Sequence, residues 1–251
     1  MFHKEASEEA TLAPTVAVLN IGNELLRGEI RNTNGRWLGA ECDRLGLSLV
    51  TVGVVPDDVA RIADFVNWAR FRHDVVLCTG GLGPTPDDVT REAVAAAFGV
   101  PCETDPERRA ELIAAGGHMD RLADPWSRRP AGGRWLAGIE GGAPSFAIGN
   151  VYALAGDPDE MQGAFERMRG ELGRWPAAIV WRHAYEVTED RISDALDAVA
   201  LACDGVIVCS YPRRTSDRDD VEIVLRALTP DALERAVAIL RTQFVEAGIV
   251  G

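Results

Sequence analysis

The chain has 251 residues, of which 47% are hydrophobic, and its formal net charge at pH 7 is −13. This length allows one large domain, or one medium domain and a small one, with a real hydrophobic core. The acidity argues against nucleic acid as a partner, because phosphate backbones need clustered cations. No apolar run approaches the roughly 18 residues of a membrane span, and the acidic N-terminus lacks a signal peptide, so we expect a cytoplasmic protein without a membrane partner.

Cysteine, lysine and histidine usage narrows the chemistry further. The five cysteines show no C-x-x-C spacing and mostly lie in apolar runs, which predicts buried, reduced thiols. Lys4 is the only lysine among 26 basic residues. A P-loop lysine and a Schiff-base lysine are therefore excluded from the folded part. The four histidines are scattered, so neither a histidine metal cluster nor an acid–base histidine is indicated.

Strands and helices alternate in the first part of the chain. After a leader expected to be disordered (residues 1–13), the apolar patterns predict strands at 16–22, 47–55 and 74–78, and helices at 34–44 and from Val59 onward. This alternation predicts βαβ units and a mostly parallel sheet covered by helices on both faces. Ligands of such sheets bind at the carboxyl ends of the strands.

The pattern changes further along the chain. A helix is predicted at 106–116, an irregular segment at 117–142, a strand at 150–156 and a helix to about residue 169. Beyond a boundary placed near residue 172, the order strand, helix, strand, strand, helix predicts a small α+β domain with an antiparallel pair. The expected organisation is an α/β domain over residues 14–172 and the small domain over 173–251.

The segment TGGLGPTPDDVTREA (residues 79–93) directly follows a predicted buried strand. Gly80 and Gly81 allow a sharp bend that presents backbone N–H groups to an anion. Thr85 is predicted to cap a helix, with Asp88 in the capping-box position. Acids in a first helical turn stabilise the helix without any functional role, so Asp88 alone leaves both interpretations open.

Two adjacent acids at this position favour a functional interpretation. A helix N-terminus attracts phosphate, but the carboxylates of Asp87 and Asp88 would repel it. A divalent cation held between carboxylate and phosphate oxygens removes this conflict. The segment therefore predicts a phosphorylated ligand accompanied by a metal ion.

These residues resemble a known family. TGGLGPTPDDVTREA is similar to the central motif of the molybdopterin-binding (molybdenum cofactor biosynthesis) domain family, which includes MoaB and MogA, and in particular to its competence/damage-inducible protein A (CinA) branch. GNELLRGEIRNTN (residues 22–34) resembles a second family segment, and VVPDD (54–58) falls in register. The resemblance covers residues 14 to about 168. It extends more weakly to the C-terminus, where CSYPRR and VEIVLRAL are similar to the molybdopterin-binding-like half of eukaryotic FAD synthases.

The resemblance implies a three-layer α/β/α fold that binds a pterin or nucleotide phosphate, and a homo-oligomer, either a dimer or a trimer. It implies a divalent metal (Mg²⁺, Mn²⁺ or Co²⁺) on Asp87 and Asp88, and molybdopterin or an adenine nucleotide as ligand. The implied catalytic residues are Asp88, Asp87 and Glu24. The implied phosphate-binding residues are Thr79, Gly80, Gly81, Gly83, Thr85, Gly22 and Asn34. Alternatively, Glu24 is a solvated loop acid, and Asn32 and Asn34 only cap the following helix.

The sequence departs from the family pattern in three segments. Residues 121–135 read RLADPWSRRPAGGRW in place of an N-x-x-Q-A-type segment, residues 141–145 read GGAPS in place of GTAPG, and residues 154–161 read LAGDPDEM. These segments flank the ligand pocket in the family. Arg128, Arg129 and Arg134 either replace the missing phosphate contacts or are solvated surface residues.

The expected function is that of a metal-dependent pyrophosphatase acting on a dinucleotide such as ADP-ribose or FAD. The first alternative is adenylyl transfer to molybdopterin, a step of molybdenum cofactor biosynthesis. The second is a noncatalytic sensor that binds a nucleotide and signals through the small domain.

Overall fold

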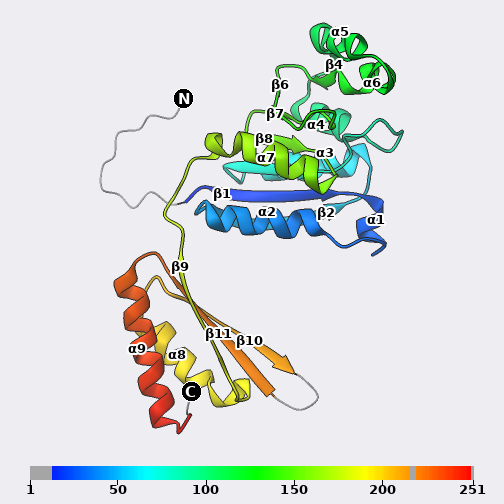
Figure 1. Cartoon of the computed structure of the whole chain (residues 1–251). Coiled ribbons are helices and arrows are strands. Elements are labelled where there is room, and N and C mark those ends of the chain that lie inside the picture. The colour runs from blue at the N-terminus through cyan, green and yellow to red at the C-terminus, as the bar shows by residue number, and fades with distance from the viewer. Residues whose placement is uncertain (1–12, 215–218, 250–251) are drawn as a thin grey trace, which may run out of the picture. The chain divides into compact units, whose positions relative to one another are not determined.

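The computed structural model describes residues 13–214 and 219–249, so the predicted disordered leader lies outside the described residues except for Ala13. The chain divides into two compact units, Met1–Trp175 and Pro176–Gly251, named here the N-terminal and C-terminal units. Each unit has a hydrophobic core of its own. Figure 1 shows the elements of both.

The N-terminal unit contains one large sheet, a two-stranded sheet and helices between the strands. In chain order its elements are β1 (Thr15–Ile21), α1 (Asn23–Leu26), α2 (Thr33–Arg44), β2 (Ser48–Val55), α3 (Val59–Arg70), β3 (Val75–Thr79), α4 (Thr90–Phe98), β4 (Cys102–Thr104), α5 (Pro106–Ala115), α6 (His118–Trp126), β5 (Arg128–Pro130), β6 (Arg134–Trp135), β7 (Phe146–Ile148), β8 (Val151–Leu154) and α7 (Pro158–Leu172).

The large sheet has the strand order β2-β1-β3-β8-β7-β6. Its first four strands are parallel, while β7 and β6 are antiparallel to their neighbours. Apolar residues of α2 and α7 cover one face, including Leu38 and Phe165. The opposite face is covered by α3 and α4, which contribute Ile62 and Val94. The predicted α/β fold with a mostly parallel sheet between two helix layers is confirmed (Figure 1).

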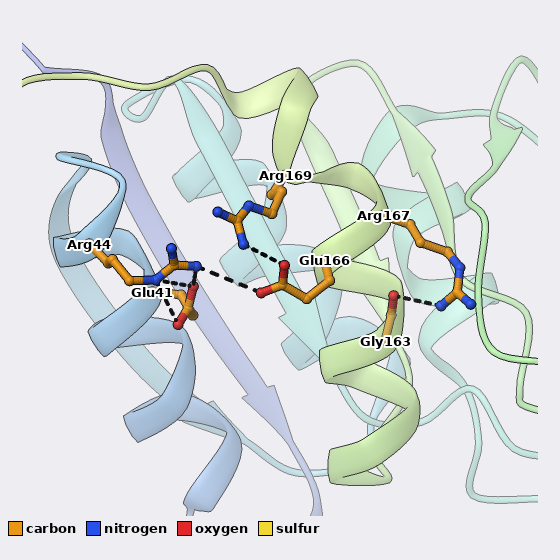
Figure 2. Close-up of polar contacts among 6 residues, drawn as sticks. All are labelled: Glu41, Arg44, Gly163, Glu166, Arg167 and Arg169. Atoms are coloured by element: carbon orange, nitrogen blue, oxygen red, sulfur yellow. Dashed lines mark hydrogen bonds and ion pairs between the residues drawn. The ribbon is translucent and has the colours of Figure 1, made fainter.

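The helices α2 and α7 lie side by side on their face of the sheet. Figure 2 shows Arg44 of α2 between Glu41 on its own helix and Glu166 of α7, whose carboxylate is 3.7 Å from the Arg44 guanidinium. Arg169 pairs with the same Glu166. These groups are partly exposed, and such pairs stabilise a fold by at most about 1 kcal/mol. The half-buried Trp37 of α2 packs edge-on against the buried Phe165 of α7, with ring centres 5.3 Å apart.

The prediction of an irregular segment over 117–142 is wrong where α6, β5 and β6 form. Gly116 and Gly117 both have positive φ and separate α6 from α5. Ala123 and Trp126 of α6 pack with Leu112 of α5 in a small core of their own. The helix α6 depends on contacts with α5. The apolar pattern did not predict it because it contains Pro125, and proline normally ends a helix.

All five cysteines are free thiols, as predicted, and Cys42, Cys78 and Cys203 are buried. Cys102 and Cys209 are only partly buried, so the prediction of burial is wrong for these two. Burial raises the pKa of Cys42 and of Cys78 to about 12. Both are therefore protonated at neutral pH and unreactive, because the thiolate is the nucleophilic form.

The C-terminal unit contains β9 (Ile179–Tyr185), a 3₁₀ turn (Glu189–Arg191), α8 (Ser193–Ala202), β10 (Ile207–Arg214), β11 (Asp219–Ala227) and α9 (Pro230–Glu246). Its antiparallel sheet has the order β10-β11-β9, and α8 and α9 pack on one face. The βαββα order is confirmed, and the first of its three predicted strands, β9, joins the predicted antiparallel pair in one sheet. In the described part of the chain, no helix combines the length and apolar character that crossing a membrane requires.

Candidate functional site

A cleft of about 240 Å³ lies at the carboxyl ends of β1 and β3. The loop after β1, the start of α2, the loop after β3 and the start of α7 form its walls. Eight predicted site residues line it: Gly22, Glu24, Asn34, Thr79, Gly80, Gly81, Asp87 and Asp88. Gly83 and Thr85 are not among its lining residues; both contact Asp88 instead.

The Asp88 carboxylate organises the loop that carries the glycines. Its Oδ1 accepts from the Gly83 N–H at 2.7 Å, and its Oδ2 accepts from the Thr85 N–H at 2.8 Å and from the Thr85 hydroxyl. The Asp88 N–H in turn donates to the Thr85 carbonyl at 3.0 Å, which closes a turn over residues 85–88. Asp88 is therefore a half-buried anchor of this loop.

The predicted helix start at Thr85 is wrong, because α4 begins at Thr90. The Thr90 hydroxyl donates to the Gly80 carbonyl at 2.8 Å, and the Thr90 N–H donates to the Gly81 carbonyl at 3.2 Å. These two bonds hold the first residue of the helix against the glycines. Residues 83–89 remain a separate turn in front of the helix.

Gly80 and Gly81 are required by the backbone geometry. Their φ angles are 107° and 67°, a region that side chains with a Cβ rarely adopt. A Cβ at Gly80 would collide with the Ile21 carbonyl oxygen, and one at Gly81 would collide with the Thr90 hydroxyl. The chain after β3 therefore passes closely over the end of β1.

The backbone N–H groups of most glycines among the predicted phosphate-binding residues are already hydrogen-bonded within the protein. The Gly80 N–H donates to the Leu154 carbonyl at 3.2 Å, and the Gly83 N–H donates to Asp88. The Gly22 N–H donates to the Val55 carbonyl at 3.1 Å. Gly81 is thus the glycine of this set whose N–H has no acceptor among the described residues.

Arg91 supports the same loop from below and was missed by the sequence analysis. Its side chain is buried, and its guanidinium donates to the Leu82 carbonyl at 2.5 Å and to the Gly83 carbonyl at 3.3 Å. Burial lowers the pKa of Arg91. Because arginines are mostly exposed, the sequence predicts a surface position for Arg91, and only the structure shows that its side chain is buried.

The two asparagines at the start of α2 differ in role. Asn32 caps the helix, because its side chain accepts from the Gly35 N–H at 2.8 Å. For Asn32 the capping interpretation is therefore confirmed. Asn34 is not a cap. Its Nδ2 donates to the Thr79 hydroxyl at 3.0 Å and to the Gly156 carbonyl at 2.8 Å, so it connects three segments of the cleft.

The charges that line the cleft are mostly negative. Carboxylates come from Glu24, Asp57, Asp87 and Asp88, whereas Arg31 is the lining residue with a positive charge. Asp87 is exposed, and hydrogen bonds from Thr85 and from its own backbone N–H lower its pKa. Asp57, missed by the sequence analysis, accepts from the Asn23 N–H at 2.8 Å and so stabilises the start of α1.

The donor atoms fit a cation that a ligand helps to hold. In the searched, described part of the chain, no three residues of the types His, Cys, Asp and Glu are grouped as a metal site. The cleft nevertheless offers carboxylate and amide oxygens, which are the ligands of Mg²⁺. Mg²⁺ in phosphate-binding sites is commonly held by one or two carboxylates, substrate phosphates and water.

The arginines considered as substitute phosphate ligands lie outside this cleft. Arg128 is paired with Glu92 at 2.7 Å, Arg129 with Asp105 at 3.0 Å, and Arg134 with Glu171. None is among the residues that line the cleft. Among the three segments that differ from the family pattern, residues 154–161 contribute Gly156 and Pro158 to the cleft. Residues 135–144 line a second cavity, of about 560 Å³, beside α5.

Comparisons with known proteins show which families the two parts of the chain match. A family model described as "Probable molybdopterin binding domain" matches residues 17–173, and one described as "FAD synthase, middle domain" matches residues 184–251. A CinA-like protein of Frankia casuarinae is 34% identical over 241 residues, which cover 83% of this chain and 55% of that protein. A protein of Pyrobaculum calidifontis is 30% identical over 94% of this chain and 99% of its own length.

A solved structure shares the fold of the N-terminal unit. The crystal structure of CinA, a protein of unknown function from Thermoplasma acidophilum, matches with a TM-score of 0.59 and 28% identity, over 64% of this chain and 99% of that chain. The chain spans about half the length of the CinA-like protein of Frankia casuarinae. The chain belongs to the molybdopterin-binding domain family, in its CinA-like branch.

Proposed function

We propose that the acidic cleft binds a nucleotide or pterin phosphate together with a divalent metal, and that the protein hydrolyses the pyrophosphate bond of a dinucleotide such as ADP-ribose or FAD. The observation that carries this proposal is the charge of the cleft, four carboxylates against one arginine. Phosphate would be repelled there unless a cation came with it. A bound divalent metal would polarise a phosphoryl oxygen.

The proposal assigns different roles to the two aspartates. Asp87 is exposed and accepts hydrogen bonds from Thr85 and from its own backbone N–H, whereas Asp88 is half-buried and also holds the Gly83 N–H. The more exposed Asp87 is therefore the proposed cation ligand. Asp88 keeps the loop in shape and has lone-pair capacity left for one further contact. Glu24, which also lines the cleft, is the proposed second acid. The Gly81 N–H is the proposed donor to a phosphate oxygen.

The comparisons guide the choice of substrate. The C-terminal unit matches a domain named for FAD synthase, which supports FAD as a test compound. The altered segment at residues 141–145 does not line the acidic cleft, so its departure from the family pattern leaves the proposed phosphate contacts intact.

Purified protein is incubated with ADP-ribose or FAD and with Mg²⁺, Mn²⁺, Co²⁺ or EDTA, and released AMP is measured. We expect metal-dependent AMP release that Asp87→Asn reduces at least about tenfold. Asp64→Asn is the matched control, because Asp64 is an exposed acid on α3 outside the cleft. Absence of AMP with every metal would contradict hydrolysis, and adenylyl transfer requiring added molybdopterin and ATP would favour the alternative.

A further inference from the structure

The strand β2 forms an unprotected edge of the large sheet. In the described part of the chain it pairs with β1 alone. Its eight residues, SLVTVGVV (48–55), include no charge and no proline. An edge strand exposes a row of unpaired backbone N–H and C=O groups, and proteins usually protect it by charge, proline or short length. At the other edge of this sheet, β6 has two residues, one of them an arginine.

The side chains of β2 leave apolar surface exposed on one face of the sheet. Val50, Val52 and Val54 are 59%, 52% and 37% exposed. In the register with β1, Val52 lies beside Val18, which belongs to the core beneath α2 and α7. Neighbours in register point to the same face of a sheet, and side chains two residues apart share a face. Val52 and Val54 therefore point to the α2 face, at the rim that α2 leaves exposed.

The other face of this edge is lined by aromatic residues. Phe65 of α3 lies over Gly53, since a Cβ added there would be 2.5 Å from its ring. Trp68 lies next to Phe65, with ring centres 5.5 Å apart, and is 40% exposed. His73 lies 5.5 Å from the Trp68 ring and places its Nε2 3.5 Å from the Thr51 hydroxyl. The edge is thus apolar on both faces of the sheet, as an interior strand is.

A second strand is the partner that suits an edge of this kind, because it supplies a matching row of backbone donors and acceptors. Charge favours the β2 strand of a second copy of this chain. The net charge of −13 means that most of the surface repels another copy. The uncharged β2 edge is a place where two copies meet without like charges in contact.

The charges that flank the edge are complementary under antiparallel pairing. The helix α3 begins at the carboxyl end of β2, and the exposed acids Asp58 and Asp64 lie at its cap and in its first half. Just beyond its end, the exposed Arg72 holds its guanidinium 5.5 Å from the centre of the Trp68 ring. When two β2 strands run antiparallel, the start of one α3 lies towards the end of the other. The acids of each copy therefore lie towards the arginine of its mate.

We propose that two copies of this chain join through β2, antiparallel across a twofold axis close to Val52, to form a dimer with one continuous sheet. An axis at Val52 brings Val50 of each copy opposite Val54 of the other, and cross-strand pairs of this kind stabilise a sheet. A twofold pairing is closed, so the proposal selects the dimer from the two oligomers that the family resemblance implies.

The dimer does not depend on the proposed function. The exposed valines of β2 and Trp68 are not among the residues that line the acidic cleft. Because the paired strands run in opposite directions, the two clefts, each at the carboxyl ends of its own strands, lie at opposite edges of the joined sheet. Each cleft is complete within one copy, so loss of the dimer leaves it intact.

The first test measures the mass of the full chain by light scattering during gel filtration. We expect the wild type to have twice the monomer mass of 27.1 kDa. Val52→Lys should have the monomer mass, because a charge on an edge strand blocks pairing. The control Val245→Lys, at a position on α9 that is 78% exposed, should stay dimeric. A monomeric wild type at about 100 μM would overturn the proposal and leave β2 to a strand of another protein.

The second test locates the interface without a charged variant. Val52→Cys places two thiols close to the twofold axis, so a short bismaleimide should link the two copies. Ser48→Cys is the matched control, an exposed position on the same strand whose two copies lie about 26 Å apart in this pairing. The wild type is the blank for its native cysteines. Linking of neither variant, or of both equally, would overturn the proposal, as would a Val52→Lys protein that remains dimeric.

Discussion

Asp87 and Asp88 are adjacent in the sequence but occupy different environments. The oxygens of Asp88 accept from two backbone N–H groups and a hydroxyl of the loop, whereas Asp87 is exposed. A residue that holds the loop and a residue that contacts the ligand should respond differently to substitution. Stability measurements can therefore separate their roles.

Asp88→Asn should destabilise the protein by about 1–3 kcal/mol. The amide offers one acceptor oxygen, so it cannot accept from Gly83 and Thr85 on separate oxygens as the carboxylate does. Urea unfolding checks this, with Asp64→Asn as a control expected to change the free energy of unfolding by less than about 0.5 kcal/mol. An Asp88→Asn variant with the wild-type urea midpoint would show that these hydrogen bonds add nothing to stability.

At the residue scale, the sequence predicted the position of the cleft more accurately than the contacts that individual residues make in it. The glycines and acids of residues 79–88 were found because several special residue types occur together. Asn20 and Asp57 were missed, since their cleft positions depend on β1 and β2 lying side by side. Burial of Arg91 likewise depends on the fold of the loop around it.

At the element scale, β1 and β3 are joined at their starts by one carboxylate. Asp74 precedes β3, and its Oδ2 accepts from the N–H and the hydroxyl of Thr15, both at 2.8 Å. These hydrogen bonds lower the pKa of Asp74, and the bond from the Thr15 backbone N–H has the larger effect. The ionised carboxylate therefore holds the neighbouring strands β1 and β3 together at the edge opposite the cleft.

The stabilisation from Asp74 should depend on pH. Because its pKa is lower in the folded chain than the unfolded value of about 3.9, the contribution is fully present above that value and is lost as the pH falls through the folded pKa. The difference in Tm between wild type and Asp74→Asn should be constant from pH 5 to 7 and shrink below about pH 4. A difference that stays constant down to pH 2 would contradict the assignment.

Apolar periodicity and capping residues predicted most helices and strands. They failed where contacts between residues distant in the sequence determine whether a helix forms or where it begins. The strands β1 and β3 and the helices α2 and α3 follow from apolar patterns and from the caps Asn32 and Asp58. The start of α4 was misplaced because Thr85 and Asp88 match a capping box, while the actual start depends on Thr90 bonding back to the glycines. The helix α6 needed α5 as a packing partner.

At the scale of the whole molecule, the two units have separate cores. The buried residues of the C-terminal unit form one cluster among themselves, and those of the N-terminal unit form three. Trp175, the last residue of the N-terminal unit, donates its N–H to the Leu45 carbonyl at 2.9 Å and packs against the core. The cleft is made entirely of residues from the N-terminal unit.

A chain truncated after Trp175 should therefore fold by itself and bind nucleotide with an affinity close to that of the full chain. Calorimetric melting should show one cooperative transition, and titration with AMP and Mg²⁺ should show binding. A second truncation, after Leu172, removes Trp175 and should have a lower Tm. An unfolded product from the first truncation would show that the C-terminal unit is needed for folding.

The central claim is that Asp87 shares a cation with the phosphate of the ligand. It is tested most directly by measuring the affinity for AMP with and without Mg²⁺, in the wild-type protein and in Asp87→Asn. Binding of metal and nucleotide to one shared site must be coupled. We predict that Mg²⁺ strengthens AMP binding to the wild type at least about tenfold and has little effect on Asp87→Asn; an equal effect of Mg²⁺ on both proteins would contradict the account.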